Sequence, residues 1–319
     1  MRHSVARPRP LRARQFSPRT RRVTVLAALG GAVAVLAVPA ALFAWGEAGH
    51  RITGEAAALA VPSDMPAFFR VAVKQLSYLN PEPDRWRDRA ERNADAALDG
   101  VNAPDHFIDM EMVPPAVLNA ALAAPDRYAY FDTIKKAGVE ANKMGFLPFR
   151  MLELSQRLRE DFRQWRAASD STRPFTEARI LDDAGLLGHY VADGSNPAHT
   201  SIQYNGWTGP NPNGYATDRQ MHFRFESQYV ENHVTTADVS PLISHTPRVF
   251  PDFRRAIDDY LATTNTQVEP MYKLDKAHPF NATTTDVADK AFVAGRLAAG
   301  AQMLRDLWWT AWVTSAPKQ

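Results

Sequence analysis

The sequence predicts an all-α protein that folds as a single, mostly helical domain from Trp45 onward. Apolar residues recur at helical spacing over most of the 319-residue chain. Segments with the apolar–polar alternation of a β-strand are scarce, and prolines such as Pro148 and Pro174 lie near the expected helix boundaries. No internal repeat or long low-complexity stretch divides the chain further, so we expect one domain over residues 45–319.

The expected helices follow one another along this domain. In the last one, Phe292, Leu297, Met303, Leu304 and Leu307 recur at mixed helical spacing, which predicts packing in the core. Residues 205–214 are rich in asparagine, glycine and proline and should form an irregular loop. The ranges expected to be helical are 48–60, 64–78, 115–124, 127–142, 146–168, 175–193, 218–232, 249–265 and 284–313.

Residues 1–44 have the pattern of an export signal. Eight arginines and no acidic residue precede Trp45, residues 23–43 are almost wholly apolar or small, and Ala44 supplies a small residue at the expected cleavage point. We therefore expect export to the periplasm or the exterior, with cleavage between Ala44 and Trp45. A membrane anchor at 23–43 is the alternative, because the run is about long enough to span a bilayer.

Charge and cysteine content narrow the classes of function. Without the eight leader arginines, 29 basic residues remain against 35 acidic ones, so the mature chain would carry a net charge of about −6. Such a protein is a poor candidate for binding duplex DNA by charge alone. The chain has no cysteine, which excludes disulfides and thiolate metal sites. Any metal must be bound by imidazole, carboxylate, backbone groups or water, which suits zinc.

The segment 189–199 is the most informative stretch for chemistry. His189 and Asp193 are four residues apart and would project from one face of a helix. His199 follows a Gly-Ser-Asn-Pro breaker, where the chain can turn back toward that face. His222 and Glu226 form a second pair at the same spacing. Clustered pairs of this kind are a known way of building metal sites in helical bundles.

Taken in order, these motifs resemble the zinc-dependent single-strand nucleases of fungi and plants (nucleases S-one and P-one), whose fold and metal core are similar to those of bacterial zinc phospholipase C. The resemblance covers the mature chain as a series of motifs. They are W-G-x-x-G-H from Trp45, D-x-x-R from Asp84, H-F-x-D from His106, H-x3-D-x5-H from His189 and H-x3-E from His222. The resemblance implies a helical fold with long loops around a trinuclear zinc site.

The resemblance also implies which residues bind the three zinc ions. Asp84, His106, His189 and Asp193 would surround the first; His199, His222 and Glu226 the second; and the α-amino and carbonyl groups of Trp45, with His50 and Asp193, the third. Since Trp45 has a terminal amine only after cleavage, assembly of the cluster would follow signal removal.

Two positions in the segment 83–88 leave alternatives. Asp84 gives D-x-x-R with Arg87, whereas Asp88 does not, but both aspartates could instead be solvated acids in a charged loop. By the resemblance, Asp84 would bind zinc and orient the attacking water. Arg87 would neutralise charge on a phosphate in the transition state, and its plainer alternative is a surface salt bridge of little energy.

Three further features concern the surroundings of the expected site. Phe107 would stack on a nucleic-acid base or pack in the core behind the metal. Asp109 would accept a hydrogen bond that orients an imidazole. The loop 203–215, with Tyr204, Trp207 and Tyr215, would contact a flipped-out base or line an acyl or choline pocket.

The predicted activity is hydrolysis of phosphodiesters by a zinc-activated water. Single-stranded DNA or RNA is the expected substrate, with 3′-nucleotides as a further one. The W-G-x-x-G-H start favours a nuclease. Glu226, where the known nucleases carry Asp, and the absence of their disulfides favour a phospholipase C acting on phospholipid head groups. A non-catalytic zinc-bound module is a third alternative, which the full ligand set argues against because structural sites are normally closed and mononuclear.

Overall fold

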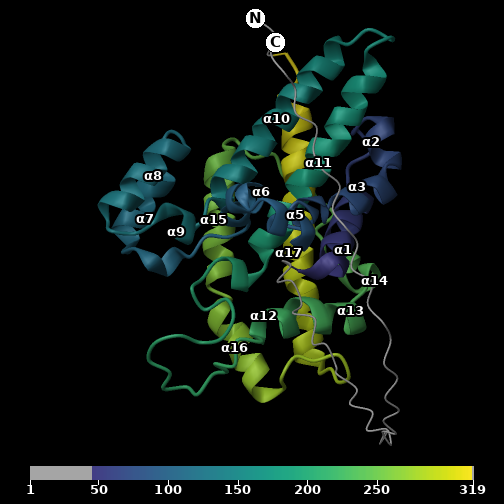
Figure 1. The fold of residues 1–319 in the computed structure, drawn as a ribbon. Coiled ribbons are helices and arrows are strands. Elements are labelled where there is room, and N and C mark those ends of the chain that lie inside the picture. The colour runs from purple at the N-terminus through teal and green to yellow at the C-terminus, as the bar shows by residue number, and fades with distance from the viewer. Residues whose placement is uncertain (1–44, 318–319) are drawn as a thin grey trace, which may run out of the picture. The chain divides into compact units, whose positions relative to one another are not determined.

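The computed structural model describes residues 45–317 and is all-helical in that range, as predicted (Figure 1). The only β-type pairing within it is an isolated bridge between Tyr204 and Gly206. The predicted signal segment and the alternative anchor at 23–43 lie outside the described residues. Within 45–317, no helix is both long enough and apolar enough to span a bilayer.

The centre of the fold is α11 (Arg173–Ser195), which packs against several long helices (Figure 1). From Asp183 to Ser195 every residue of this helix is buried, as expected for a helix enclosed on all sides. Pro174 lies in its first turn and Asn196, which precedes Pro197, ends it. The helices around it are α1 (Gly46–Leu59), α3 (Val73–Leu79), α10 (Leu147–Ala167), α15 (Phe253–Asn265) and α17 (Val287–Thr314).

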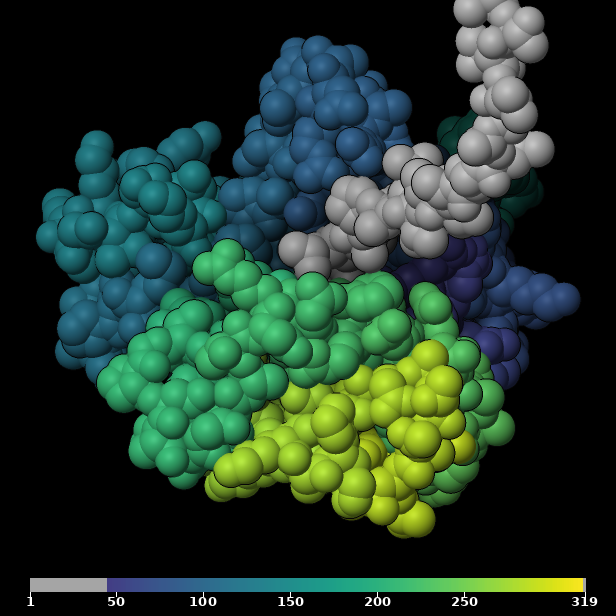
Figure 2. Space-filling model, turned by 60° about the horizontal axis from the view of Figure 1, so that its bottom comes forward, coloured from purple at the N-terminus to yellow at the C-terminus, as the bar shows by residue number. Residues whose placement is uncertain are grey.

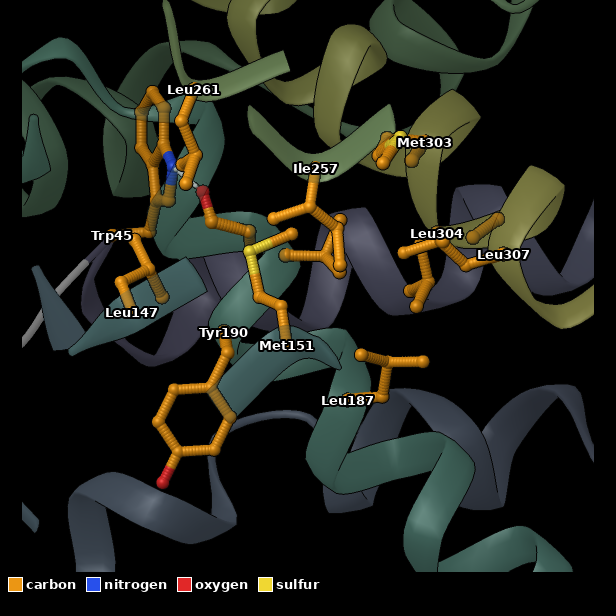
Figure 3. Packing of buried hydrophobic residues seen from close by; sticks show 14 of the residues in the cluster. Trp45, Leu147, Met151, Leu187, Tyr190, Ile257, Leu261, Met303, Leu304 and Leu307 are labelled. Atoms are coloured by element: carbon orange, nitrogen blue, oxygen red, sulfur yellow. Dashed lines mark hydrogen bonds between the residues drawn. The ribbon is translucent and has the colours of Figure 1, made fainter. Parts of the chain in front are cut away.

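The core lies between these helices (Figure 3). Leu187, Leu304 and Leu307 are fully buried, and truncation of such a side chain to alanine costs about 2–5 kcal/mol. Trp45 is also fully buried, and its indole nitrogen donates to the carbonyl oxygen of Ala192 at 2.7 Å. The first residue of the described chain is therefore held against α11 one residue from Asp193.

Shorter elements connect this bundle and surround its loops. In Figure 1 the elements α7, α8 and α9 form a group beside α15. The remaining helices are α2 (Ala67–Val71), α4 (Glu82–Arg85), α5 (Arg89–Ala94), α6 (Ala97–Asn102), α7 (Pro115–Leu122), α8 (Arg127–Lys136), α9 (Ala141–Met144), α12 (Met221–Phe223), α13 (Val230–His233), α14 (Thr236–Val239) and α16 (Val268–Ala277). The 3₁₀ segments are η1 (Ala103–His106), η2 (Met110–Met112), η3 (Pro197–His199) and η5 (Ser240–Leu242), and η4 (Arg224–Tyr229) is a π-helix.

Several predicted helix boundaries were wrong. The expected helix at 64–78 is divided at Ala72, and the one at 127–142 is divided after Lys136, where Gly138 adopts a positive φ of 83°. The short helices between 82 and 102 were not predicted, because segments of four to six residues are too short to show apolar periodicity. The ten-residue helix α16 was missed as well.

Candidate metal centre

The bend after α11 brings the residues of the predicted H-x3-D-x5-H motif into one buried site. His189 and Asp193 lie one turn apart on α11, and both are fully buried. After the break at Asn196 and Pro197, η3 turns the chain back, and His199 Nδ1 donates to the carbonyl oxygen of His106 at 2.6 Å. The motif therefore converges on the segment that carries His106.

A first group of metal-binding side chains consists of Asp84, His106 and His189, with Asp193 beside them. Each of the three offers one ligand atom within 4.8 Å of the others. His189 Nε2 lies 3.0 Å from His106 Nδ1. Asp84 Oδ1 lies 3.9 Å from each of these nitrogens, and Asp193 Oδ2 lies 3.0 Å from His106 Nδ1 and 3.4 Å from His189 Nε2.

A second group consists of His199, His222 and Glu226. His222 Nε2 lies 2.7 Å from Glu226 Oε2 and 3.3 Å from His199 Nε2. His222 and Glu226 are four residues apart, and the segment that joins them was expected to be α-helical. Instead, Glu226 lies in the π-helix η4, a wider turn that is rare and often found at functional sites.

A third group lies at the start of α1. His50, His189 and Asp193 form one more set of ligand atoms within 4.8 Å, and His50 Nε2 lies 3.5 Å from Asp193 Oδ1. The backbone nitrogen of Trp45 donates to Glu226 Oε2 at 3.1 Å, so the amino end of the described chain lies between the second and third groups. Trp45 also has a positive φ of 45°, a conformation that costs a non-glycine residue about 1–3 kcal/mol and that clusters at functional sites.

Asn80 orients two of the imidazoles, a role that sequence reasoning missed. Its side-chain oxygen accepts from His50 Nδ1 at 3.0 Å and its carbonyl oxygen accepts from His189 Nδ1 at 2.9 Å. Gly188 makes this possible, because a Cβ at that position would lie 2.3 Å from Asn80 Nδ2. A lone asparagine before a proline gives no signal of this contact in the sequence.

The hydrogen bond from His189 Nδ1 to Asn80 leaves the other ring nitrogen of His189, Nε2, for a metal. A neutral imidazole that donates a hydrogen bond through Nδ1 has a lone pair on Nε2. In metal-binding histidines, the ring nitrogen that does not bind the metal typically makes such a hydrogen bond. His189 Nε2, which faces the oxygens of Asp84 and Asp193, is therefore unprotonated and cannot donate a hydrogen bond to them. Within residues 45–317, Asp84 Oδ1 and Asp193 Oδ1 are buried and have no hydrogen-bond partner.

The spacing of the donors also fits zinc. Ligand atoms at 2.0–2.2 Å from a tetrahedral ion are separated by roughly 3.3–3.6 Å. The distances given above lie on both sides of this range, from 2.7 Å between His222 and Glu226 to 3.9 Å between Asp84 and His189. The buried groups can therefore hold metal ions, and their nitrogen and oxygen donors suit zinc.

Burial shifts the pKa values of the site so that the ionised carboxylates are costly, and a bound cation would offset that cost. It raises the pKa of Asp84 and Asp193 well above the usual range and raises the pKa of Glu226 to about 7. It also lowers the pKa of His189 and lowers the pKa of His222 to about 4. The imidazoles are thus neutral at physiological pH, whereas three carboxylates share a site that lacks buried lysine or arginine within the described chain.

A cavity of about 580 Å³ opens onto this centre. It lies where His106, His199 and His222 meet two residues singled out from the sequence, Arg87 and Phe107. Figure 2 shows a recess between the blue-to-teal segments of the first half of the chain and the green segment after residue 200. Such a volume is within the range of small-molecule sites.

Arg87 and Phe107 both occupy the wall of this cavity. The Arg87 side chain is 21% exposed, with Nη1 3.9 Å from Asp84 Oδ1 and Nε 3.3 Å from Asp99 Oδ1. Phe107 is half-buried and lies outside the main hydrophobic core. The aromatic ring is therefore available to a ligand in the cavity.

The structure distinguishes the two aspartates of the segment 83–88. Asp84 is buried among the histidines, as described above. Asp88 is exposed, and its side chain caps α5 by accepting from the backbone nitrogens of Ala90 and Glu91. The geometry therefore favours Asp84 as the metal-facing residue.

Two expectations about the surroundings were wrong. Asp109 makes no hydrogen bond to an imidazole in the described chain; it lines the cavity, and burial raises its pKa to about 7. Trp207 and Tyr215 do not line the cavity but pack against Tyr272. Of the three aromatic residues in the loop 203–215, only Tyr204 contributes to the cavity wall.

Comparison of the chain with protein-family models, with curated proteins and with solved structures finds no match.

Proposed function

We propose that the mature chain is a zinc-dependent phosphodiesterase that hydrolyses single-stranded nucleic acids, with 3′-nucleotides as a further substrate. The observation that carries the proposal is that Arg87 and Phe107 line the same cavity as His106, His199 and His222. Metal-binding side chains, a cation and a half-buried aromatic ring in one cavity suit a substrate that has both a phosphate and a base.

The residues present can supply the chemistry of such a reaction. Trp45, His50, Asp84, His106, His189, Asp193, His199, His222 and Glu226 would hold three zinc ions, with the terminal amine of Trp45 formed by cleavage after Ala44. When bound, zinc supplies Lewis-acid polarisation of a phosphoryl oxygen and a water of lowered pKa.

Asp84 and Arg87 would act directly on the reacting groups. Asp84 Oδ1 is buried, has no hydrogen-bond partner within residues 45–317 and can orient the attacking water. The Arg87 guanidinium, 3.9 Å from that oxygen, would neutralise charge that develops on the phosphate. Its ion pair with Asp99 fixes its position before substrate binds.

The wall of the cavity favours a nucleic acid over a free phosphate ester. Arg87 and Lys143 both line it, and two separate cations suit successive phosphates of one strand. Phe107 can stack on a base, which contributes about 1–3 kcal/mol and does not depend on the identity of that base.

Phospholipid is the second candidate because part of the same wall is apolar. Met112 and Ile202 lie there beside Phe107 and would accommodate acyl chains near the head group. In that case the protein is a zinc-dependent phospholipase C.

A substrate panel separates these alternatives. The purified protein would be incubated with single-stranded DNA, RNA, 3′-nucleotides and phosphatidylcholine vesicles, with and without a chelator. We expect chelator-sensitive hydrolysis of the nucleic acids. Hydrolysis of the lipid alone would show a phospholipase C, and three bound zinc ions without any hydrolysis would show a non-catalytic module.

The two aspartates of the segment 83–88 provide a matched pair of variants. Asp84→Asn should abolish the chelator-sensitive activity, because it removes a buried carboxylate from the metal centre. Asp88→Asn should leave activity unchanged, because asparagine is also a good helix N-cap. Equal activity in the two variants would contradict the proposed role of Asp84.

A further inference from the structure

A second cluster of metal-binding side chains lies at the junction of α16 and α17. It consists of His278, which follows the last turn of α16, Asp286, the N-cap of α17, and Asp289 in the first turn of α17. One ligand atom from each lies within 4.8 Å of the others. None of these residues belongs to the metal centre described above.

Asp289 is the residue that distinguishes this cluster from an ordinary acidic helix start. It is only 2% exposed, and within residues 45–317 its Oδ1 atom has no hydrogen-bond partner. Burying a carboxylate without a partner is costly unless a cation neutralises it. Burial raises the pKa of Asp289, the nearby Asp286 carboxylate raises it further, and His278 lowers it.

The neighbouring charged side chains already have other partners. Lys290, the next residue along α17, pairs with Asp238 at 2.9 Å. Arg224 pairs with Asp275 at 2.9 Å and with Asp218 at 2.6 Å. His278 is exposed, so a metal can reach the cluster from solvent.

From this geometry we infer that His278, Asp286 and Asp289 form a separate site for one divalent transition-metal ion such as Zn²⁺. One imidazole and two carboxylates supply three of four tetrahedral positions, and water would supply the fourth. The imidazole disfavours Ca²⁺ and Mg²⁺, which prefer oxygen ligands only. The inference does not depend on the proposed function.

The metal would stabilise the segment that connects α16 to α17, residues 278–286. This connection packs on the π-helix η4: the Phe280 ring lies 5.1 Å from the ring of Phe225 and 5.2 Å from that of Tyr229. Thr285 in the same connection makes a hydrogen bond with the Tyr229 hydroxyl. Because Phe225 and Tyr229 flank Glu226 in η4, the second site would stabilise the segment that carries a residue of the main centre.

Metal counting tests the inference. The purified protein and its His278→Ala and Asp289→Asn variants would be dialysed against Zn²⁺, and bound zinc would be measured by elemental analysis. His245→Ala is the matched control, because His245 is exposed and lies outside every cluster of metal-binding groups found in residues 45–317. We expect each of the two variants to hold one equivalent less zinc than the unsubstituted protein, and the control to hold the same amount.

Stability provides a second readout that keeps the test decisive if Asp289→Asn does not fold. His278 is exposed, so His278→Ala should fold. Added Zn²⁺ should raise the melting temperature of the chelator-treated His278→Ala protein by less than it raises that of the control. Equal zinc content in His278→Ala and His245→Ala would overturn the inference, and binding of Ca²⁺ but not Zn²⁺ at the cluster would overturn the assigned class of metal.

Discussion

Asp193 is the residue whose replacement tests the arrangement of the metal centre most sharply. Its two oxygens face different groups: Oδ1 lies 3.5 Å from His50 Nε2, and Oδ2 lies 3.0 Å from His106 Nδ1. Asp193→Asn keeps the size of the side chain but removes its charge and one of its oxygens. If Asp193 bridges two zinc ions, bound zinc should fall from three equivalents to one in the main centre, rather than from three to two.

The same variant should change stability in opposite directions with and without metal. Without metal, Asp193 is a fully buried carboxylate whose pKa burial and the neighbouring Asp84 raise well above the usual range. Removing its charge should therefore stabilise the chelator-treated protein at neutral pH by about 1–4 kcal/mol, which corresponds to roughly 2–10 °C in melting temperature. With zinc present, the variant should melt below the unsubstituted protein because two bound ions are lost.

Asp183→Asn provides the matched control on the same helix. Asp183 is 1% exposed and pairs with Arg157 at 2.8 Å, away from the metal centre. Its replacement should leave the zinc content unchanged, and its effect on stability should be the same with and without zinc. A bridging Asp193 is ruled out if Asp193→Asn loses only one equivalent of zinc, and a costly buried charge is ruled out if the variant destabilises the chelator-treated protein.

Three further predictions concern catalysis, the hydrogen bonds that orient the imidazoles, and pH. Arg87→Ala should lower kcat for single-stranded DNA by roughly 10²-fold to 10³-fold with unchanged zinc content, whereas Arg85→Ala should not; equal rates would contradict the role of Arg87. Asn80→Ala should weaken zinc binding by roughly 10-fold to 100-fold in a chelator competition. Burial raises the pKa of Glu226 from 4.5 to about 7. Its ionisation therefore destabilises the metal-free protein as pH rises through that window, whereas zinc requires the ionised form. The difference in melting temperature between zinc-loaded and chelator-treated protein should widen from about pH 5 to about pH 7.5, and much less so in Glu226→Gln.

The helical class and the pairing of His189 with Asp193 and of His222 with Glu226 could be predicted from the sequence because both depend on local spacing. His189 and Asp193 are brought together by a single turn of α11, so four residues of sequence already determine their relation. His222 and Glu226 were predicted to meet for the same reason, and they do, although through a π-helix rather than an α-helix.

Contacts that join distant segments could not be predicted in the same way. Asn80 and His189 are 109 positions apart in the sequence, and their hydrogen bond depends on the close approach of two segments at Gly188. Nothing in the local sequence indicates that approach. Trp207 and Tyr215 do not line the cavity, and their rings pack against Tyr272 on the unpredicted helix α16.

The proposed trinuclear zinc centre is tested most directly by a zinc titration of the chelator-treated His278→Ala protein, which lacks the proposed second site. Cleavage of single-stranded DNA would be measured at each step. We expect no cleavage without zinc and a rate that reaches its plateau at three equivalents per chain. Cleavage that persists without zinc, or a plateau at one equivalent, would rule out a trinuclear zinc phosphodiesterase.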